Sequence, residues 1–261
     1  MDAIACGAPS ADGIRNLPVT VLDCEPKAAQ TMESLAQIAE RRLHPPITDP
    51  SYLLLRARRK IFVGWAGRLH GDRLVVLDIG GRYQPYRALF ADRIHRYIGV
   101  DVLQTEFVSV VADGQALPFA PLTFDVVIAT QVLDCLRDPV AAVHHMHTLL
   151  KPGGVFLASV PSCAPRFADE ERWRFLPSGL RTMLEPFSTV EIVAELDSLR
   201  SIIRTVNLAL DTFVRYNSAR RVYRLSICPM FNLLGLGIEK LNLTSNDRFA
   251  ANFSVRAVKG P

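Results

Sequence analysis

Short apolar runs recur through the middle of the chain, and each is separated from the next by a helical pattern or a turn. The runs have the length and β-branched content of buried strands and lie at 75–79, 97–101, 107–111, 124–129 and 154–160. Helical spacing of apolar residues appears between them, at 86–95 and 139–150. Because strands that alternate with helices form parallel sheets, the pattern predicts an α/β, doubly wound, Rossmann-like fold.

The flanking segments follow other patterns. Helices are predicted at 31–43 and 52–69, the second with a basic face that suits either solvent or a membrane surface. Strand alternation returns at 189–196 and 251–258, and between them residues 198–241 form an apolar helical insertion before the last strand. We therefore expect an N-terminal arm and helical cap over 1–70, with a loose arm at 1–27, and a cofactor-binding domain over 71–261.

The stretch Leu74–Tyr86 (LVVLDIGGRYQPY) organises the central region. A buried strand ends at the glycine pair Gly80-Gly81, and a helical pattern follows. A strand, a glycine turn and a helix N-terminus form the opening of a nucleotide-type cofactor site. Asp101 then closes the next strand, at about the 20-residue spacing at which doubly wound folds place an acid for ribose hydroxyls.

A dinucleotide cofactor is the main competitor at this turn. Its pyrophosphate requires glycines in the pattern G-x-G-x-x-G, whereas Arg82, Tyr83 and Gln84 follow the glycine pair here. A cofactor that lacks a pyrophosphate, such as S-adenosylmethionine, tolerates these side chains better. A NAD-dependent oxidoreductase remains the alternative.

Composition narrows the choice further. The 261 residues are 49% hydrophobic with a net charge of +4, which suits an anionic substrate or a membrane surface. We expect no nucleic-acid partner, because no basic run carries interleaved aromatic residues. Five scattered cysteines without C-x-x-C spacing indicate reduced thiols and no metal site. With no signal segment and no long uncharged apolar run, a cytoplasmic location is expected, with peripheral contact at the inner face of the membrane left open.

An ordered series of segments resembles class I S-adenosylmethionine-dependent methyltransferases. LDIGG is similar to the family's first motif and YIGVDV to its second strand. The segment VVADGQALPFAPLTFDVVIATQVLDCL is similar to its adenine-side acid and fourth strand, and HTLLKPGG to the turn before its fifth. WRFLPSGL resembles a bacterial subgroup associated with polysaccharide or natural-product pathways. The match spans about residues 74–196 and implies a seven-stranded sheet, parallel except for one strand. It also implies S-adenosyl-L-methionine as cofactor and S-adenosyl-L-homocysteine as product.

The resemblance also assigns cofactor contacts. It implies that Gly80 and Gly81 lie against the aminoacyl part, that Asp78 orients the ammonium or the loop, that Asp101 accepts both ribose hydroxyls, and that Asp113 accepts from the adenine amino group. The complete expected set is Asp78, Gly80, Gly81, Arg82, Asp101, Val102, Asp113, Gly114, Thr130 and Gln131. The chain departs from the family's D-x-G-x-G-x-G pattern at Arg82 and Gln84.

The catalytic residues are less defined. The family often carries Glu-His after the fourth strand, and this chain has Asp134-Cys135, so no general base is borrowed from it. Residues after strands four and five are candidates to line the acceptor pocket: Asp134, Glu171, Trp173 and Arg174. Arg174 suits a phosphate or carboxylate, or equally an ion pair with Glu170 or Glu171.

The expected reaction is O-methylation of a sugar, glycan or secondary metabolite. A non-catalytic scaffold that binds S-adenosylmethionine is an alternative. So is docking of the 198–241 insertion on a membrane that carries a lipid-linked glycan, and a homodimer contact through the cap or this insertion also stays open.

Overall fold

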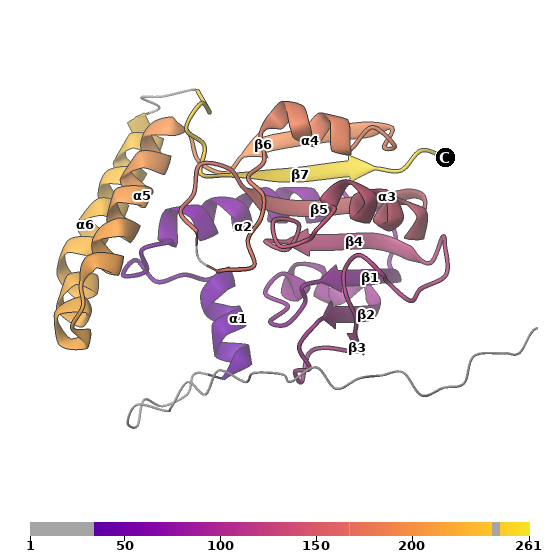
Figure 1. The fold of residues 1–261 in the computed structure, drawn as a ribbon, viewed down its shortest axis with the longest axis horizontal. Coiled ribbons are helices and arrows are strands. Elements are labelled where there is room, and N and C mark those ends of the chain that lie inside the picture. Colours follow the sequence, from indigo (N-terminus) through magenta and orange to yellow (C-terminus); the bar gives the residue numbers. More distant parts are fainter. Residues whose placement is uncertain (1–33, 167, 242–245) are drawn as a thin grey trace, which may run out of the picture. The chain divides into compact units, whose positions relative to one another are not determined.

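The predicted strands assemble into one mixed sheet (Figure 1). The computed structural model describes residues 34–166, 168–241 and 246–261. In these residues the strands are β1 Leu74–Ile79, β2 Ile94–Asp101, β3 Val110–Val111, β4 Phe124–Thr130, β5 Leu150–Pro161, β6 Thr189–Ala194 and β7 Asn252–Val258. The seven described strands lie in the order β3-β2-β1-β4-β5-β7-β6, and β7 runs antiparallel to both β5 and β6. The predicted fold class is confirmed.

Helices flank this sheet and extend from its edge. They are α1 Leu35–Leu43, α2 Tyr52–Ala66, α3 Pro139–Leu149, α4 Pro177–Met183, α5 Ser198–Phe213 and α6 Asn217–Leu241. Local chemistry sets their starts. Ser34 forms a capping box with Gln37 at the start of α1, and the Asp138 carboxylate accepts from the Ala141 N–H at the start of α3. The predicted loose arm at 1–27 lies outside the described residues, and the boundary near residue 70 stays a prediction.

The helix predicted at 86–95 is wrong in type and extent. The structure has a 3₁₀ helix, η1, over Arg87–Arg93, and Ile94 already belongs to β2. Gln84 adopts a left-handed φ of 47° and its side chain ties the loop to Phe107 O. This anchored loop uses up the chain between β1 and β2, which leaves room for only a short, tight helix.

One strand prediction and one turn prediction also need correction. Of the strand predicted at 107–111, only Val110 and Val111 pair with β2. The turn predicted at Lys151-Pro152-Gly153-Gly154 lies inside β5, because Leu150 already pairs with Phe124 and Gly153 N–H donates to Lys259 O. The pairing of β4 with β5 shifts register between Phe124 and Val126, and Gly153 allows this with a left-handed φ of 73°.

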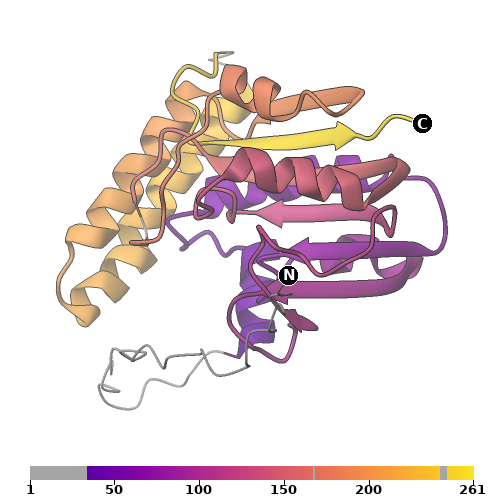
Figure 2. The same cartoon turned by 45° about the vertical axis from the view of Figure 1, so that its right-hand side comes forward.

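The sheet is buried on both faces. Val127 and Ala129 of β4 pack into a cluster with α3 and α4, whereas Val126 and Ile128 of the same strand pack with α2 and η1. This alternation follows from the two-residue period of a strand. The helices on the two faces are visible in Figures 1 and 2.

Helices α5 and α6 form a hairpin between β6 and β7, as predicted for the insertion before the last strand. Since β6 runs parallel to β5, the hairpin leaves and rejoins the sheet at the edge where β1, β2, β4 and β5 end, which we call the carboxyl edge (Figure 1). Among the described residues, no helix combines the length and apolarity needed to cross a bilayer.

Candidate active site at the carboxyl edge

The glycine turn after β1 is tied to β2. Gly80 has a φ of 73°, and the N–H groups of Gly80 and Gly81 both donate to Val100 O, at 2.8 and 3.0 Å. A Cβ on Gly81 would lie 2.7 Å from Asp78 O, so a side chain does not fit there. These two amides therefore shape the turn and are not free to bind the cofactor's anionic atoms.

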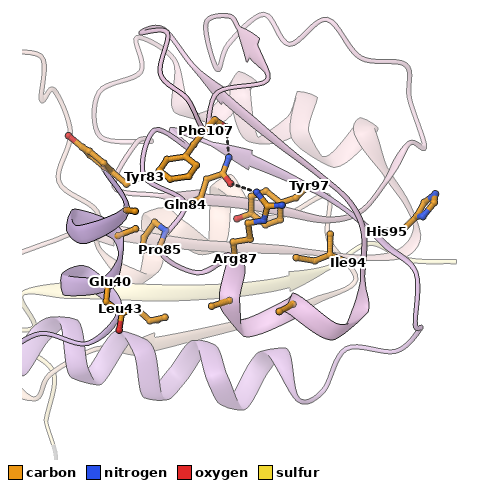
Figure 3. Close-up of a pocket in the computed structure, with 14 residues that line it drawn as sticks. Glu40, Leu43, Tyr83, Gln84, Pro85, Arg87, Ile94, His95, Tyr97 and Phe107 are labelled. Carbon is orange, nitrogen blue, oxygen red and sulfur yellow. Dashed lines mark hydrogen bonds between the residues drawn. The ribbon is translucent and has the colours of Figure 1, made fainter. Parts of the chain in front are cut away.

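Gln84 fills the position where the family's pattern has its last glycine. Its amide bridges Phe107 O and the Arg87 guanidinium, as Figure 3 shows. A Cβ on Gly99 would run into this amide. Side-chain hydrogen bonds of Gln84 thus replace the bare backbone that glycine would give.

The cavity in Figure 3 lies on the α1 side of this loop and measures about 600 Å³. Its walls come from α1, the loop 83–85, η1 and the β2 residues Ile94, His95 and Tyr97. Its described lining residues include none of those that the sequence assigns to the cofactor. This cavity is therefore a feature separate from the predicted cofactor site.

Asp101 closes β2 and is buried. Its Oδ1 accepts from the Leu103 N–H at 2.9 Å and lies 3.3 Å from Arg82 Nη2. Arg82 is one-third exposed. Val102, beside Asp101, is largely exposed. Asp101 lies at the end of β2, as its spacing predicts, but Arg82, the residue after the glycine pair, already contacts its carboxylate.

Asp78 is buried at the end of β1, and the Tyr97 hydroxyl donates to its Oδ2 at 2.7 Å. Burial raises the pKa of the Asp78 carboxyl to about 7. The Tyr97 hydrogen bond opposes this rise and the Asp101 carboxylate adds to it. Asp78 therefore titrates near neutral pH.

The remaining predicted cofactor residues lie along the same edge. The Asp113 carboxylate accepts from the Gln115 N–H at 2.9 Å, which is the turn geometry that an Asp-Gly pair favours. A Cβ added at Gly114 would lie 3.1 Å from the Ile79 side chain, so this glycine packs closely against β1. Thr130 ends β4, half-buried. Gln131 has a φ of 54° and its amide binds Ser159 and Asn252, so it points toward β5 and β7.

The catalytic candidates come together on two loops. The carbonyl of Asp134 accepts from the N–H groups of Arg172 and Trp173, at 2.7 and 3.2 Å. Arg174 pairs with Glu171 at 2.6 Å, which is the ion-pair alternative of the sequence analysis. The Trp173 indole donates to Leu136 O. The structure therefore brings Asp134, Glu171, Trp173 and Arg174 into one group.

Asp134 differs from its neighbours in burial and bonding. Its side chain is buried, and its Oδ1 has no hydrogen-bond partner in the described part of the chain. Burial raises the pKa of the Asp134 carboxyl, Glu171 raises it further and Arg174 opposes the rise. A buried carboxylate with an unsatisfied oxygen is suited to accept a proton or hydrogen bond from a bound molecule.

Sequence reasoning missed a buried ion pair behind this edge. Glu195, just after β6, binds Arg58 of α2 through two contacts of 2.8 and 3.0 Å, and it also accepts from Ser159 and Ser254. The solvated basic face predicted for α2 is therefore wrong at Arg58. The signal was available, because Arg58 lies one helical turn from Leu54 and from Phe62 on the buried face.

Comparison with known proteins gives the family. Residues 39–209 match the family model described as a methyltransferase domain. A probable S-adenosylmethionine-dependent methyltransferase of Mycolicibacterium smegmatis is 29% identical over 179 residues, which cover 64% of this chain and 65% of that protein. The human mitochondrial protein named arginine-hydroxylase NDUFAF5 is 29% identical over 141 residues, covering 47% and 40%. The chain spans less than two thirds of the length of these relatives.

Solved structures include a phosphoethanolamine N-methyltransferase of Haemonchus contortus in complex with S-adenosylhomocysteine. It is 15% identical, with a TM-score of 0.48, and the match covers 87% of this chain and 60% of that one.

The hydrogen-bond acceptors at the carboxyl edge fit the cofactor of this family. One carboxylate ends β2, at Asp101, and another follows β3, at Asp113, at the edge of the sheet where doubly wound folds bind adenosine. Carboxylates accept from the ribose hydroxyls and the adenine amino group. With the family match over most of its length, the chain belongs to the S-adenosyl-L-methionine-dependent methyltransferases of class I.

Proposed function

We propose that the chain methylates a hydroxyl oxygen of a sugar, a glycan or a secondary metabolite at the carboxyl edge beside Asp134. The observation that supports this proposal is the buried Asp134 carboxylate with an unpartnered Oδ1. A hydroxyl acceptor must lose a proton during transfer, and a carboxyl whose pKa is raised by burial accepts a proton better than an ordinary one. Asp134 is the general base of the proposal.

S-adenosylmethionine supplies a methyl group on a sulfonium, which is already a good leaving group. The chain's own residues therefore have two tasks. Asp101 and Asp113 hold the adenosine from the ends of β2 and β3, and Asp134 receives the acceptor's proton. Transfer then depends mainly on holding the acceptor oxygen in line with the methyl group.

Arg82 takes part in cofactor binding in this proposal. Its guanidinium lies 3.3 Å from Asp101 Oδ1, on the carboxylate that is assigned to the ribose. To admit both ribose hydroxyls the guanidinium moves aside, where it is free to pair with the cofactor's own carboxylate. The second candidate function is a scaffold that binds S-adenosylmethionine without turnover, which the altered glycine turn and the Asp134-Cys135 pair in place of Glu-His motivate.

Two variants test the proposal. Asp101→Ala should weaken the binding of S-adenosylhomocysteine, measured by calorimetry, by at least about tenfold, because hydrogen bonds to a charged acceptor are lost. Asp134→Asn should keep this affinity but lower the rate about 10²-fold or more. The rate is read as S-adenosylhomocysteine release with a panel of glycosides, nucleotide sugars and phenols.

The outcomes separate the candidates. Undiminished binding by Asp101→Ala would show that the cofactor site is misplaced. Tight binding by the wild-type protein with no product release across the panel would favour the scaffold. Full activity of Asp134→Asn would remove Asp134 as the base while leaving the cofactor site intact.

A further inference from the structure

The α5–α6 hairpin has an inverted distribution of polar and apolar side chains. Most of its buried residues are polar: Ser198, Ser201, Arg204, Asn207 and Asp211 on α5, with Tyr223 and Asn232 on α6. The buried Ile203 and Ile238 pack in a small apolar cluster with Leu53 and Leu54 of α2. Its exposed residues are mostly large and apolar: Ile202, Val206, Leu210, Phe213, Tyr216, Val222, Leu225, Ile227, Met230, Leu233, Leu234 and Leu241. We call this exposed set the outer face. Large contiguous apolar surfaces mark interaction sites.

Hydrogen bonds hold the polar interior together. The Tyr223 hydroxyl donates to the side chain and the carbonyl of Asn207, and Arg224 grips Asp211 at 2.7 and 2.8 Å. Asn232 donates to Ile47 O and Asp49 O, in the segment that joins α1 to α2. Because these polar groups have hydrogen-bond partners, the polar interior is a stable part of the hairpin's structure.

The outer face is a continuous stripe on α5. Ile202, Val206, Leu210 and Phe213 recur at spacings of four, four and three residues, which places them on one side of the helix. At the end of the hairpin that is remote from the sheet, Phe213 is 80% exposed and Tyr216 is 77% exposed. We call residues 213–222 the hairpin tip. Aromatic residues at such a tip suit the boundary between lipid and water.

Charge distinguishes among the occupants that could cover this face. Residues 212–238 contain four arginines and no Asp or Glu. The hairpin's acids are already paired, Asp211 with Arg224 and Glu239 with Arg56, Lys60 and Arg200. Arg215 and Arg221 are exposed at the tip, and neither forms an ion pair with another described residue. An anionic surface from outside the chain would complement them.

We propose that the outer face of the α5–α6 hairpin docks on an anionic phospholipid membrane, with the apolar side chains in the interfacial layer and the tip arginines on lipid phosphates. An amphipathic surface that combines exposed Phe, Tyr and Leu with arginines binds in this way. A second copy of the chain is the poorer occupant, since its hairpin brings the same arginines and no unpaired acid.

The hairpin's place in the fold gives the docked protein an orientation. It leaves the sheet after β6 and returns at β7, on the carboxyl edge that carries Asp101 and Asp134 (Figures 1 and 2). Docking through the outer face would therefore bring that edge toward the lipid surface. The docking itself does not depend on the proposed methyl transfer.

Vesicle flotation of the full-length chain tests the proposal. We expect the protein to float with vesicles of phosphatidylcholine that contain about one third phosphatidylglycerol, and to float less with phosphatidylcholine alone. Arg215→Gln with Arg221→Gln should weaken binding to the anionic vesicles about 30-fold, from the contribution of two basic residues near such a surface. Phe213→Ser with Leu225→Ser and Met230→Ser should weaken binding to both vesicle types more than tenfold.

The matched control carries Leu122→Asn and Val140→Ser, which remove exposed apolar side chains far along the chain from the hairpin. It should float like the wild type. Calorimetry with S-adenosylhomocysteine checks that each variant is folded. If the triple variant does not fold, the result of the double arginine variant decides whether the hairpin docks on the membrane. No flotation of the wild-type protein would overturn the proposal. So would a dimer, seen by light scattering, that the triple variant abolishes, because it would assign the outer face to a second copy.

Discussion

The central sheet and the α5–α6 hairpin bury opposite kinds of side chain. In the sheet, burial follows hydrophobicity: Leu77, Val127 and Phe156 are inside and packed between helices. In the hairpin, Asn207 and Asn232 are inside while Leu225 and Met230 face outward. The sheet thus gains its stability from apolar burial within the chain. The hairpin buries few apolar side chains, among them Ile203 and Ile238, and leaves most of its large apolar residues exposed.

A buried ion pair, Arg58 with Glu195, lies between the two regions together with its hydrogen bonds, and we call this group the ionic layer. Glu195 follows β6 and holds Arg58, Ser159 and Ser254 just before the chain enters α5. Arg204 of α5 is also buried near this layer, and burial together with the charge of Arg58 lowers its pKa to about 10. The polar interior of the hairpin therefore begins where the apolar core of the sheet ends.

The largest effect is expected from opening this layer. Glu195→Ala leaves the Arg58 guanidinium buried without its carboxylate, and breaking such a pair costs about 3–5 kcal/mol. Urea denaturation should show this loss in the free energy of unfolding. Asp169→Ala is the control. Asp169 pairs with Arg166 in solvent, so its loss should cost about 1 kcal/mol or less. Similar costs for the two variants would mean that the buried ion pair stabilises the fold no more than a surface pair does.

The second effect tests the sheet side through pH. The folded protein raises the pKa of Asp78 to about 7, above the value of about 4 in an unfolded chain. The folded state therefore holds the proton more tightly, and the contribution is complete below pH 4 and is lost as the pH rises through 7. The loss is at most a few kcal/mol.

Asp78→Asn carries no titrating carboxyl at this position. Relative to the wild type, its unfolding free energy should rise as the pH increases from about 4 to 7 and level off above that, measured by urea denaturation at each pH. Parallel pH profiles for the two proteins would contradict the burial of an ionisable Asp78 beside Tyr97.

Much of the sheet could be predicted from the sequence because each strand carries a local signal of its own. The runs around Leu77 and Val127 are apolar for a strand's length and are followed by turns or helices. The 3₁₀ form of η1 could not be predicted in this way, since it depends on Gln84 reaching Phe107, a contact between distant segments. The α-helix expected at 86–95 does not form, because the contact between Gln84 and Phe107 fixes the preceding loop and the apolar periodicity does not reveal it.

The candidate site shows the same division. Asp101 is where spacing placed it, but its contact with Arg82 required the folded loop. Asp134 was found by its position after β4, whereas its burial and unsatisfied oxygen follow from the loop that carries Arg172 and Trp173. The inversion of the hairpin was missed because helical spacing reveals an apolar stripe without showing which side of the helix is covered.

The smallest expected effect, and the most direct test of the comparison, comes from two adjacent positions on α5. Val206 is 43% exposed and Asn207 is fully buried, where it binds Tyr223 and lies near Asn232. In the sheet, truncating an apolar residue to Ala is the costly change. In the hairpin we expect the reverse. Asn207→Ala should cost about 1–3 kcal/mol because it leaves buried partners unsatisfied. Val206→Ala should stay within about 0.5 kcal/mol.

Both Ala variants gain helix propensity, so propensity does not produce the difference between them. Urea denaturation without lipid or detergent measures both costs in the absence of an external surface. If Val206→Ala proved the more destabilising of the two, the outer face would already be covered within the chain, and the contrast between the regions would be lost. If Asn207→Ala is the more destabilising variant, the apolar surface at Val206 contributes little to folding, as expected of a side chain that contacts a surface outside the chain.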